Sequence, residues 1–412
     1  MLKSSLITIG TRGLTAVINF LLAIISARYL GAEGRGFISI FILNTTLVQL
    51  AAGFIGGAGL VYLFPRHNKV QMYFASLYWV TAVSVLIPLV MAALSEDARS
   101  TLWMLMAVSW LQSVLRVQSG YLISQERILA NNLINLLYPF AAITCVWILF
   151  EYLNMISPVS FLWAVLAGSL ASVLAGVFAL KNEKFFIPVF NVFAELKAAW
   201  KYGYVVQAGN IIQLLNYRLS FYLLDFFSGK AAVGIFSMAV SLAEVLWIVA
   251  NSFAINLYSK ISNSTDKEKN IAQTLSTFRL VLATTLIPSV VILLLPGSFY
   301  AFIFGDEFLH LSSIFPWLIP GVVLLTLNII LVHYFSGSGQ PSIALKASLL
   351  AFVSLVIFSI TLIPNRGAEG AALASSVGYA ASALSAMYYF NKVKRLTVKD
   401  FVFSRTDLKL NR

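Results

Sequence analysis

Charged residues are scarce in this chain. They make up 11% of its 412 residues, whereas soluble domains carry about 25%. Hydrophobic residues make up 59%, a share that no water-soluble core explains. We therefore expect the lipid bilayer to surround most of the molecule.

Cysteine is almost absent as well. Cys145 is the single cysteine and lies in an apolar run, which excludes a disulfide framework within the chain and a cysteine-rich metal site. An enzyme would need catalytic acids, metal ligands or a sizeable domain outside the membrane. The motifs Asp-x-Asp and His-Glu-x-x-His and a phosphate-binding glycine loop are missing. We expect a protein that is not an enzyme and that holds no cofactor and no metal.

Apolar stretches long enough to cross a bilayer, which takes about 20 residues, follow one another along the chain. They predict an all-α integral membrane protein with two pseudo-symmetric halves of six transmembrane helices. The expected helices are 6–29, 37–63, 70–94, 101–124, 131–153, 158–180, 202–226, 232–258, 274–296, 313–335, 342–363 and 368–391. The first apolar run is too long for a signal peptide, so we expect it to be the first spanning helix.

This pattern divides the chain into four parts. They are an N-terminal half (1–180), a cytoplasmic linker (181–201), a C-terminal half (202–391) and a basic cytoplasmic tail (392–412). In the linker, residues 191–201 place apolar side chains at helical spacing opposite Lys197 and Lys201, which favours an interfacial helix over a solvated linker.

Positive charge is distributed unequally between the two sides of the expected bundle. One alternating set of loops, together with both termini, carries eighteen Lys and Arg residues, and the opposite set carries five. The positive-inside rule then places both termini in the cytoplasm. The formal charge of +12 does not indicate nucleic acid, because the cations are dispersed over loops and helix ends.

Short repeats support a duplicated architecture. Gly36-Phe37-Ile38-Ser39 opens the second expected helix, and Gly234-Ile235-Phe236-Ser237 opens the eighth, 198 residues later. Gly31-Ala32-Glu33-Gly34 recurs as Gly367-Ala368-Glu369-Gly370. Such repeats are common in transporters.

Four ionisable residues fall well inside expected helices, where a charge costs about 2.5–3.5 kcal/mol by insertion scales. They are Arg12, Arg116, Arg218 and Glu244. Each therefore needs a functional or structural reason. Asp225, by contrast, falls at a helix end and is expected to be interfacial.

Gln207, Arg218 and Asp225 fall on one face of the seventh expected helix. A polar stripe of this kind faces a cavity or a partner helix. Arg218 can also form a buried ion pair with Glu244 of the next helix, and such a pair is compatible with substrate binding.

Five polar residues share one face of the first expected helix: Thr8, Arg12, Thr15, Asn19 and Ser26. For Arg12, snorkelling to the headgroups is the alternative to a site, but it does not explain Asn19 or Ser26. For Arg116 we favour snorkelling. The acids of the first six helices all lie in loops or at helix ends, so the interior favours an anionic ligand over a cationic one.

Three segments resemble the Wzx-type polysaccharide flippases of the MOP exporter superfamily. The first runs from Arg28 to Gly36. The second joins Tyr202-Gly203, Asn216-Tyr217-Arg218-Leu219, Gly234 to Ala239 and Leu242 to Trp247. The third runs from Gly367 to Ala372. Ser220 stands where relatives usually have an acid after the Arg-Leu pair, so that acid's coupling role is not carried over.

The resemblance implies transport of undecaprenyl-diphosphate-linked oligosaccharide repeat units across the bacterial inner membrane, for O-antigen, capsule or exopolysaccharide assembly. It implies alternating access to a central cavity. On the polar helix faces described above, we expect Arg12, Asn19, Gln207 and Arg218 to bind the substrate and Glu244 and Asp225 to take part in coupling or ion pairing. The implied partners are the lipid-linked oligosaccharide, membrane lipid, a polysaccharide polymerase and a chain-length regulator, without nucleic acid.

Two other functions compete with this interpretation. A MATE-type cation-coupled exporter would share the fold, but the missing carboxylates inside the first half weigh against it. A membrane polysaccharide polymerase or glycosyltransferase would need the catalytic features that the sequence does not contain.

Overall fold

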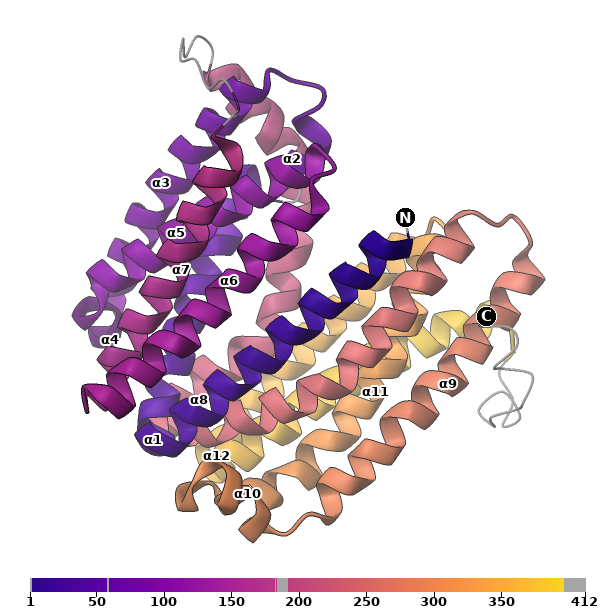
Figure 1. The fold of residues 1–412 in the computed structure, drawn as a ribbon. Coiled ribbons are helices and arrows are strands. Elements are labelled where there is room, and N and C mark those ends of the chain that lie inside the picture. The colour runs from indigo at the N-terminus through magenta and orange to yellow at the C-terminus, as the bar shows by residue number, and fades with distance from the viewer. Residues whose placement is uncertain (1, 58, 182, 184–191, 396–412) are drawn as a thin grey trace. The chain divides into compact units, whose positions relative to one another are not determined.

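The computed structural model describes residues 2–57, 59–181, 183 and 192–395, and all the regular elements in these ranges are helices (Figure 1). In chain order they are α1 (Leu2–Gly56), α2 (Gly59–Leu63), α3 (Lys69–Leu94), α4 (Glu96–Ser100), α5 (Leu102–Ser124), α6 (Ile128–Trp147), a π-helical turn (Ile148–Tyr152), α7 (Pro158–Leu180), α8 (Val192–Ser262), α9 (Lys267–Leu294), α10 (Gly297–Phe304), a 3-10 turn (Asp306–Phe308), α11 (Leu311–Gly337) and α12 (Pro341–Val393).

Three of these elements consist of two helices joined at a glycine. The joints are Gly31 in α1, Gly229 in α8 and Gly367 in α12, with φ of +67°, +79° and +51°. Only glycine adopts such angles readily. When each limb is counted, the described residues contain six long helices before residue 181 and six after it, which confirms the predicted twelve.

Local sequence explains where several helices begin. Asn68 accepts hydrogen bonds from the N–H groups of Val70 and Gln71, both at 3.1 Å, and so caps α3. Asp266 caps α9 through the N–H of Lys269 at 3.0 Å. These caps satisfy N–H groups that have no partner inside the helix. The short helices α4 and α10 were not predicted, because neither is long enough to show an apolar period.

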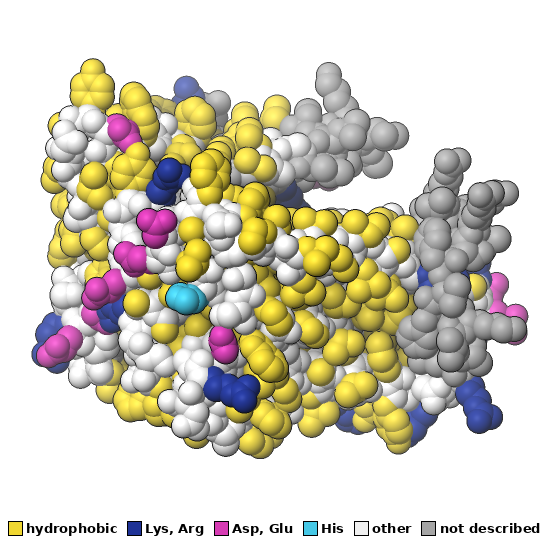
Figure 2. All heavy atoms as spheres, turned by 90° about the horizontal axis from the view of Figure 1, so that it is seen from below, with side chains coloured by type: hydrophobic (Ala, Val, Ile, Leu, Met, Phe, Trp, Pro, Cys, Tyr) yellow, Lys and Arg dark blue, Asp and Glu magenta, His cyan; other side chains and the backbone are white. Residues whose placement is uncertain are grey.

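Eight of the described helices, three of them double, are long and apolar enough to cross a membrane. The long helix α5 is not among the eight, because it carries Gln112, Arg116 and Gln118 along its length. Figure 2 shows hydrophobic side chains over much of the visible face, with Asp, Glu, Lys and Arg side chains and a histidine among them.

The chain folds as two compact units. Unit 1 comprises residues 1–30 and 37–211, and unit 2 comprises residues 31–36 and 212–412. In unit 1, α5 packs against α3 and α7, and α6 packs against α7. In unit 2, α11 packs against α9 and α12.

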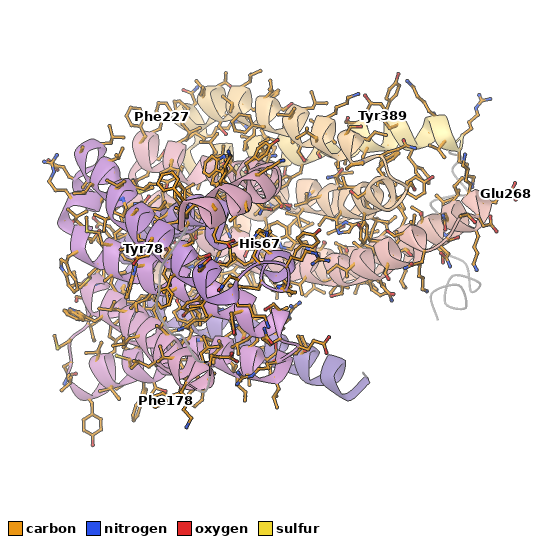
Figure 3. The ribbon with its side chains drawn as sticks, turned by 90° about the horizontal axis from the view of Figure 1, so that it is seen from above. His67, Tyr78, Phe178, Phe227, Glu268 and Tyr389 are labelled. Atoms are coloured by element: carbon orange, nitrogen blue, oxygen red, sulfur yellow. The ribbon has the colours of Figure 1, made fainter. Side chains whose placement is uncertain are left out.

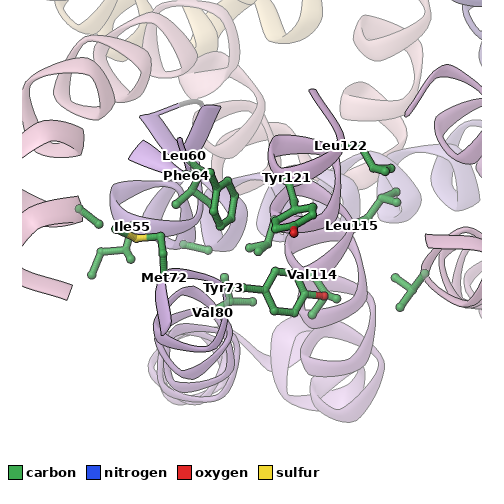
Figure 4. Close-up of a cluster of buried hydrophobic side chains, with 14 of the residues drawn as sticks. Ile55, Leu60, Phe64, Met72, Tyr73, Val80, Val114, Leu115, Tyr121 and Leu122 are labelled. Atoms are coloured by element: carbon green, nitrogen blue, oxygen red, sulfur yellow. The ribbon is translucent and has the colours of Figure 1, made fainter. Parts of the chain in front are cut away.

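Aromatic side chains fill part of the core of unit 1 (Figure 4). The ring of Tyr121 contacts the ring of Phe64 at a centroid distance of 5.1 Å and that of Tyr73 at 6.1 Å, both edge to face. Edge-to-face pairs of this kind add to the stabilisation from burial. They connect the segment after α2 with α3 and α5.

The start of α8 belongs to unit 1. The ring of Trp200 stacks on that of Phe54 at 4.9 Å and meets Trp79 edge to face at 5.6 Å. Gly203 permits close packing here, since a Cβ at this position would lie 2.0 Å from the carbonyl oxygen of Phe54. The helix expected at 191–201 is therefore helical from Val192. Unit 1 passes into unit 2 later, at Ile211 and Ile212 inside α8. The expected tail 392–412 falls outside the described residues from 396 onwards.

Candidate functional site

Unit 1 contains an open pocket of about 530 Å³. Its walls come from α1, α5, α6, the early part of α8 and the segment around α2. The described residues that line it are Thr11, Arg12, Thr15, Gly53, Gly57, Val61, Arg116, Ser119, Gly120, Ile123, Asn131, Asn132, Asn135, Gln207 and Asn210. Most of these residues are polar or small, although the surrounding helices are strongly apolar.

Two arginines give the pocket its charge. Arg12 comes from the first limb of α1, and Arg116 comes from α5. Both side chains are exposed, so a ligand in the pocket can reach them. The described lining residues include no Asp or Glu, and the lining therefore carries a net charge of two positive units. Such a site attracts anions, and guanidinium groups bind phosphate oxygens in a bidentate manner.

Carboxamide side chains form a second part of the wall. The Nδ2 atom of Asn135 donates to Ser119 Oγ at 3.1 Å, and that of Asn132 donates to Thr8 Oγ1 at 2.8 Å. The Nδ2 atom of Asn210 donates to Gln207 Oε1 at 3.1 Å. Each carboxamide has two N–H donors and an acceptor oxygen. These bonds fix the orientation of the groups while leaving capacity for a hydroxyl-bearing ligand.

Gln207 is held firmly in the wall. Its Nε2 atom donates to the carbonyl oxygen of Leu50 at 2.6 Å. Gly53 makes room for it, because a Cβ at Gly53 would lie 2.9 Å from Gln207 Nε2. The glycine at this position therefore serves the geometry of the pocket as well as helix packing.

The structure brings together only two of the four residues expected to bind substrate. Arg12 and Gln207 line the pocket of unit 1. Asn19 lies on α1 as an exposed side chain, outside the lining. Arg218 belongs to unit 2, so the predicted stripe of Gln207, Arg218 and Asp225 is divided between the two units.

Arg218 and Glu244 form an ion pair in unit 2, which is the alternative that the sequence left open. The two limbs of α8 bring them together, as they do the rings of Tyr217 and Trp247, stacked at 5.2 Å. The guanidinium carbon of Arg218 also lies 5.2 Å from the ring centroid of Phe221. Asp225 pairs with Lys230 at 3.4 Å, near the joint of α8.

Several pocket residues were not expected. Arg116 was interpreted as snorkelling, and the three asparagines of α6 and Asn210 were not singled out. A signal was present, because Asn131, Asn132 and Asn135 cluster at the start of an otherwise apolar helix. The sequence does not show that α5, α6 and α8 line one pocket, because they are separated along the chain. Within the part of the chain that the structure describes, no group of three or more His, Cys, Asp or Glu residues could hold a metal ion.

Comparisons with known sequences give partial matches. No protein-family model matches the chain. A stretch of 153 residues, which is 36% of this chain, aligns at 29% identity with "Lipid II flippase MurJ" from Bacillus subtilis (strain 168). The alignment covers 28% of that protein. A stretch of 182 residues, which is 43% of this chain, aligns at 26% identity with "Capsular polysaccharide biosynthesis protein CapF" from Staphylococcus aureus. The alignment covers 46% of that protein. The matches thus span less than half the length of these relatives.

Comparisons with solved structures extend over nearly the whole chain. An inward-facing multidrug resistance MATE family transporter of the MOP superfamily aligns with a TM-score of 0.75 at 16% identity, over 93% of this chain and 96% of that one. Lipid II flippase MurJ in an inward closed conformation aligns with a TM-score of 0.77 at 15% identity, over 98% and 90%. At these identities the likeness establishes the fold. This chain is therefore an all-α, multi-pass membrane protein with the fold shared by MATE transporters and MurJ.

Proposed function

We propose that this protein is a flippase that moves undecaprenyl-diphosphate-linked oligosaccharide repeat units across the bacterial inner membrane by alternating access. The units would serve O-antigen, capsule or exopolysaccharide assembly. The observation that carries the proposal is the pocket of unit 1, with two arginines and no Asp or Glu among its described lining residues.

The chemistry of this pocket suits a lipid-linked sugar diphosphate. The diphosphate needs cationic groups to replace the water that it loses, and Arg12 and Arg116 supply ten N–H donors between them. The carboxamides of Asn132, Asn135 and Asn210 suit sugar hydroxyls, which both donate and accept hydrogen bonds. The lipid tail would stay in the bilayer, where no pocket is required.

The comparisons support this proposal over other anionic substrates. One relative is named a lipid II flippase and another a capsular polysaccharide biosynthesis protein. Both names concern molecules of the cell envelope. We propose a polysaccharide polymerase and a chain-length regulator as partners, because flipped repeat units must be consumed on the far side of the membrane.

Asn19 of unit 1 and Arg218 of unit 2 each remain in the proposal as a further binding residue outside this pocket. The ion pair with Glu244 uses the Nη2 group of Arg218, and a guanidinium has five N–H donors. Arg218 therefore keeps donors for a phosphate oxygen while Glu244 holds its orientation. Glu244 and Asp225 are proposed to take part in ion pairing or coupling.

Substitution of the two pocket arginines tests the proposal. In a strain lacking the native chain, Arg12→Ala and Arg116→Ala should each lower surface polymer, per unit of protein in the membrane, about tenfold, as expected when a hydrogen bond to a charged group is lost. Lipid-linked repeat units should accumulate. Lysine at either position should retain part of the activity, because it keeps the charge and loses the fork.

Arg366→Ala is the matched control, since Arg366 is exposed and lies in unit 2, outside the pocket lining. It should leave polymer unchanged. Wild-type polymer from the Arg12→Ala, Arg116→Ala double variant would refute the proposal.

A MATE-type exporter is the second candidate, and the likeness to a MATE transporter favours it. A cationic drug would be repelled by Arg12 and Arg116, and no lining carboxylate is described to hold it. Drug resistance that depends on expression of this chain, without any change in lipid-linked sugars, would favour the exporter.

A further inference from the structure

Two lysines from the two limbs of α12 approach one tyrosine ring. The ammonium group of Lys346 lies 5.9 Å from the ring centroid of Tyr389, and that of Lys392 lies 5.8 Å from the same centroid. Lys392 also lies 4.4 Å from the ring centroid of Tyr388. These distances fall within the range of cation–π attraction, about 6 Å. The two ammonium groups are therefore at most about 12 Å apart.

The depth of these lysines corresponds to a membrane surface. At 1.5 Å per residue, Lys346 and Lys392 lie about 32 and 38 Å along their limbs from Gly367, and the hydrocarbon core is about 30 Å thick. A Cβ at Gly367 would lie 3.6 Å from Ser228 Oγ. Phe227, beside Ser228 in the chain, lies toward one end of unit 2, and Tyr389 lies toward the other (Figure 3). The lysines thus lie at headgroup level, opposite the turn at Gly367.

The surroundings of the lysines are apolar and exposed. Leu384, Tyr388 and Lys392 are spaced four residues apart and share a face of the second limb, and Leu384 and Tyr388 are 62% and 58% exposed. On the first limb, the exposed side chains of Leu350 and Val353 follow Lys346 along the helix. Acyl chains cover such faces in a bilayer, so a cation at their end meets phosphate groups.

Neither lysine forms an ion pair with a carboxylate in the described part of the chain, unlike Lys230, which pairs with Asp225. Both are exposed. Their positive charge is therefore available to a ligand from outside the protein, and the tyrosine rings hold the two flexible side chains near each other.

We propose that Lys346 and Lys392 form a binding site for an anionic phospholipid. The lipid phosphate lies between the two ammonium groups, and the acyl chains follow the exposed faces that end at Leu384 and Val353. Basic pockets between transmembrane helices bind anionic headgroups in this manner. The site is separate from the pocket of unit 1 and does not depend on the transport activity proposed above.

Native mass spectrometry of the purified full chain tests the site. With phosphatidylglycerol as the probe and phosphatidylethanolamine as reference, the wild type should retain phosphatidylglycerol preferentially. Lys346→Gln with Lys392→Gln should lower this preference by about fivefold for each lysine. Arginine at both positions should restore it, because the charge returns.

The matched control is Lys267→Gln with Lys269→Gln, which removes the same charge from two exposed lysines at the start of α9. It should bind phosphatidylglycerol like the wild type, and soluble glycerol phosphate should not displace the lipid. Equal losses in both double variants would mean general surface attraction and would overturn the proposal. So would unchanged binding in the Lys346, Lys392 variant or displacement by glycerol phosphate. Equal unfolding temperatures of the two variants exclude misfolding as the cause.

Discussion

Gly36 and Gly234 pack against each other's helices in a reciprocal manner. A Cβ at Gly36 would lie 1.9 Å from the carbonyl oxygen of Lys230, and a Cβ at Gly234 would lie 1.8 Å from that of Ala32. Gly234 follows Gly36 by 198 residues, and Lys230 follows Ala32 by the same interval. The contact therefore has the two-fold relation expected of an internal repeat in which each copy contacts the other. The short sequence repeat at these glycines coincides with this reciprocal contact.

Alanine at either of these glycines should destabilise the protein. A methyl group cannot fit within 2 Å of a carbonyl oxygen, so the helices must separate, at a cost of about 1–3 kcal/mol or more. Thermal unfolding in detergent should show a lower midpoint for Gly36→Ala and for Gly234→Ala. Gly209→Ala is the control, since a Cβ there meets nothing within 4 Å. An equal midpoint for all three variants would contradict the packing described.

Glu307 is bonded to the joint of α1 at Gly31, and both belong to unit 2. Its carboxylate accepts a hydrogen bond from the N–H of Ala32 at 2.7 Å. Glu307→Ala should remove a charge-assisted bond worth about 1.5–3 kcal/mol and speed hydrogen exchange at the Ala32 amide. Glu33→Ala, an exposed acid of the same turn, should leave that exchange unchanged. If the two variants exchanged at the same rate, the bond would have no role in holding the turn.

The ion pair between Arg218 and Glu244 should appear in a double-mutant cycle. Glu244→Gln leaves an arginine without its partner, and Arg218→Gln leaves a carboxylate alone. The double variant should be more stable than the sum of the single losses predicts, with a coupling of about 0.5–3 kcal/mol. Additive losses in thermal unfolding would show that the two groups do not stabilise each other.

The unequal distribution of cations predicts that both termini are cytoplasmic. In a Cys145→Ser background, a cysteine at Ser228 should react with an impermeant thiol reagent added to intact cells. A cysteine at Thr265 should react only after the membrane is opened. Both positions are exposed, so accessibility within the fold is matched. The opposite labelling pattern would reverse the orientation.

The helices could be predicted because apolar runs record them directly. The predicted range 158–180 is the observed α7, and the predicted breaks near Gly31, Gly229 and Gly367 coincide with residues at positive φ. The boundary between the two units, which lies inside α8, could not be predicted, because the sequence favours a helix on both sides of Ile211 and Ile212. It depends on tertiary contacts such as the stacking of Trp200 on Phe54.

The candidate site was predictable in part. Arg12 and Gln207 could be identified because each lies on a polar face of an otherwise apolar helix. Arg116 was assigned to the membrane surface, since distance from the helix end alone cannot distinguish snorkelling from a pocket wall. The pairing of Arg218 with Glu244 was expected from similar depth on neighbouring limbs, and the structure contains it.

Transport in purified proteoliposomes tests whether this protein is a flippase. The substrate would be a fluorescent undecaprenyl-diphosphate oligosaccharide, and the measurement would be the rate at which an impermeant quencher gains access to it. The wild type and Arg366→Ala should translocate this lipid at similar rates, and the Arg12→Ala, Arg116→Ala variant should be at least about tenfold slower, as expected from the loss of charge-assisted hydrogen bonds. A wild-type rate equal to that of protein-free vesicles, or an unchanged rate in the double variant, would contradict the account.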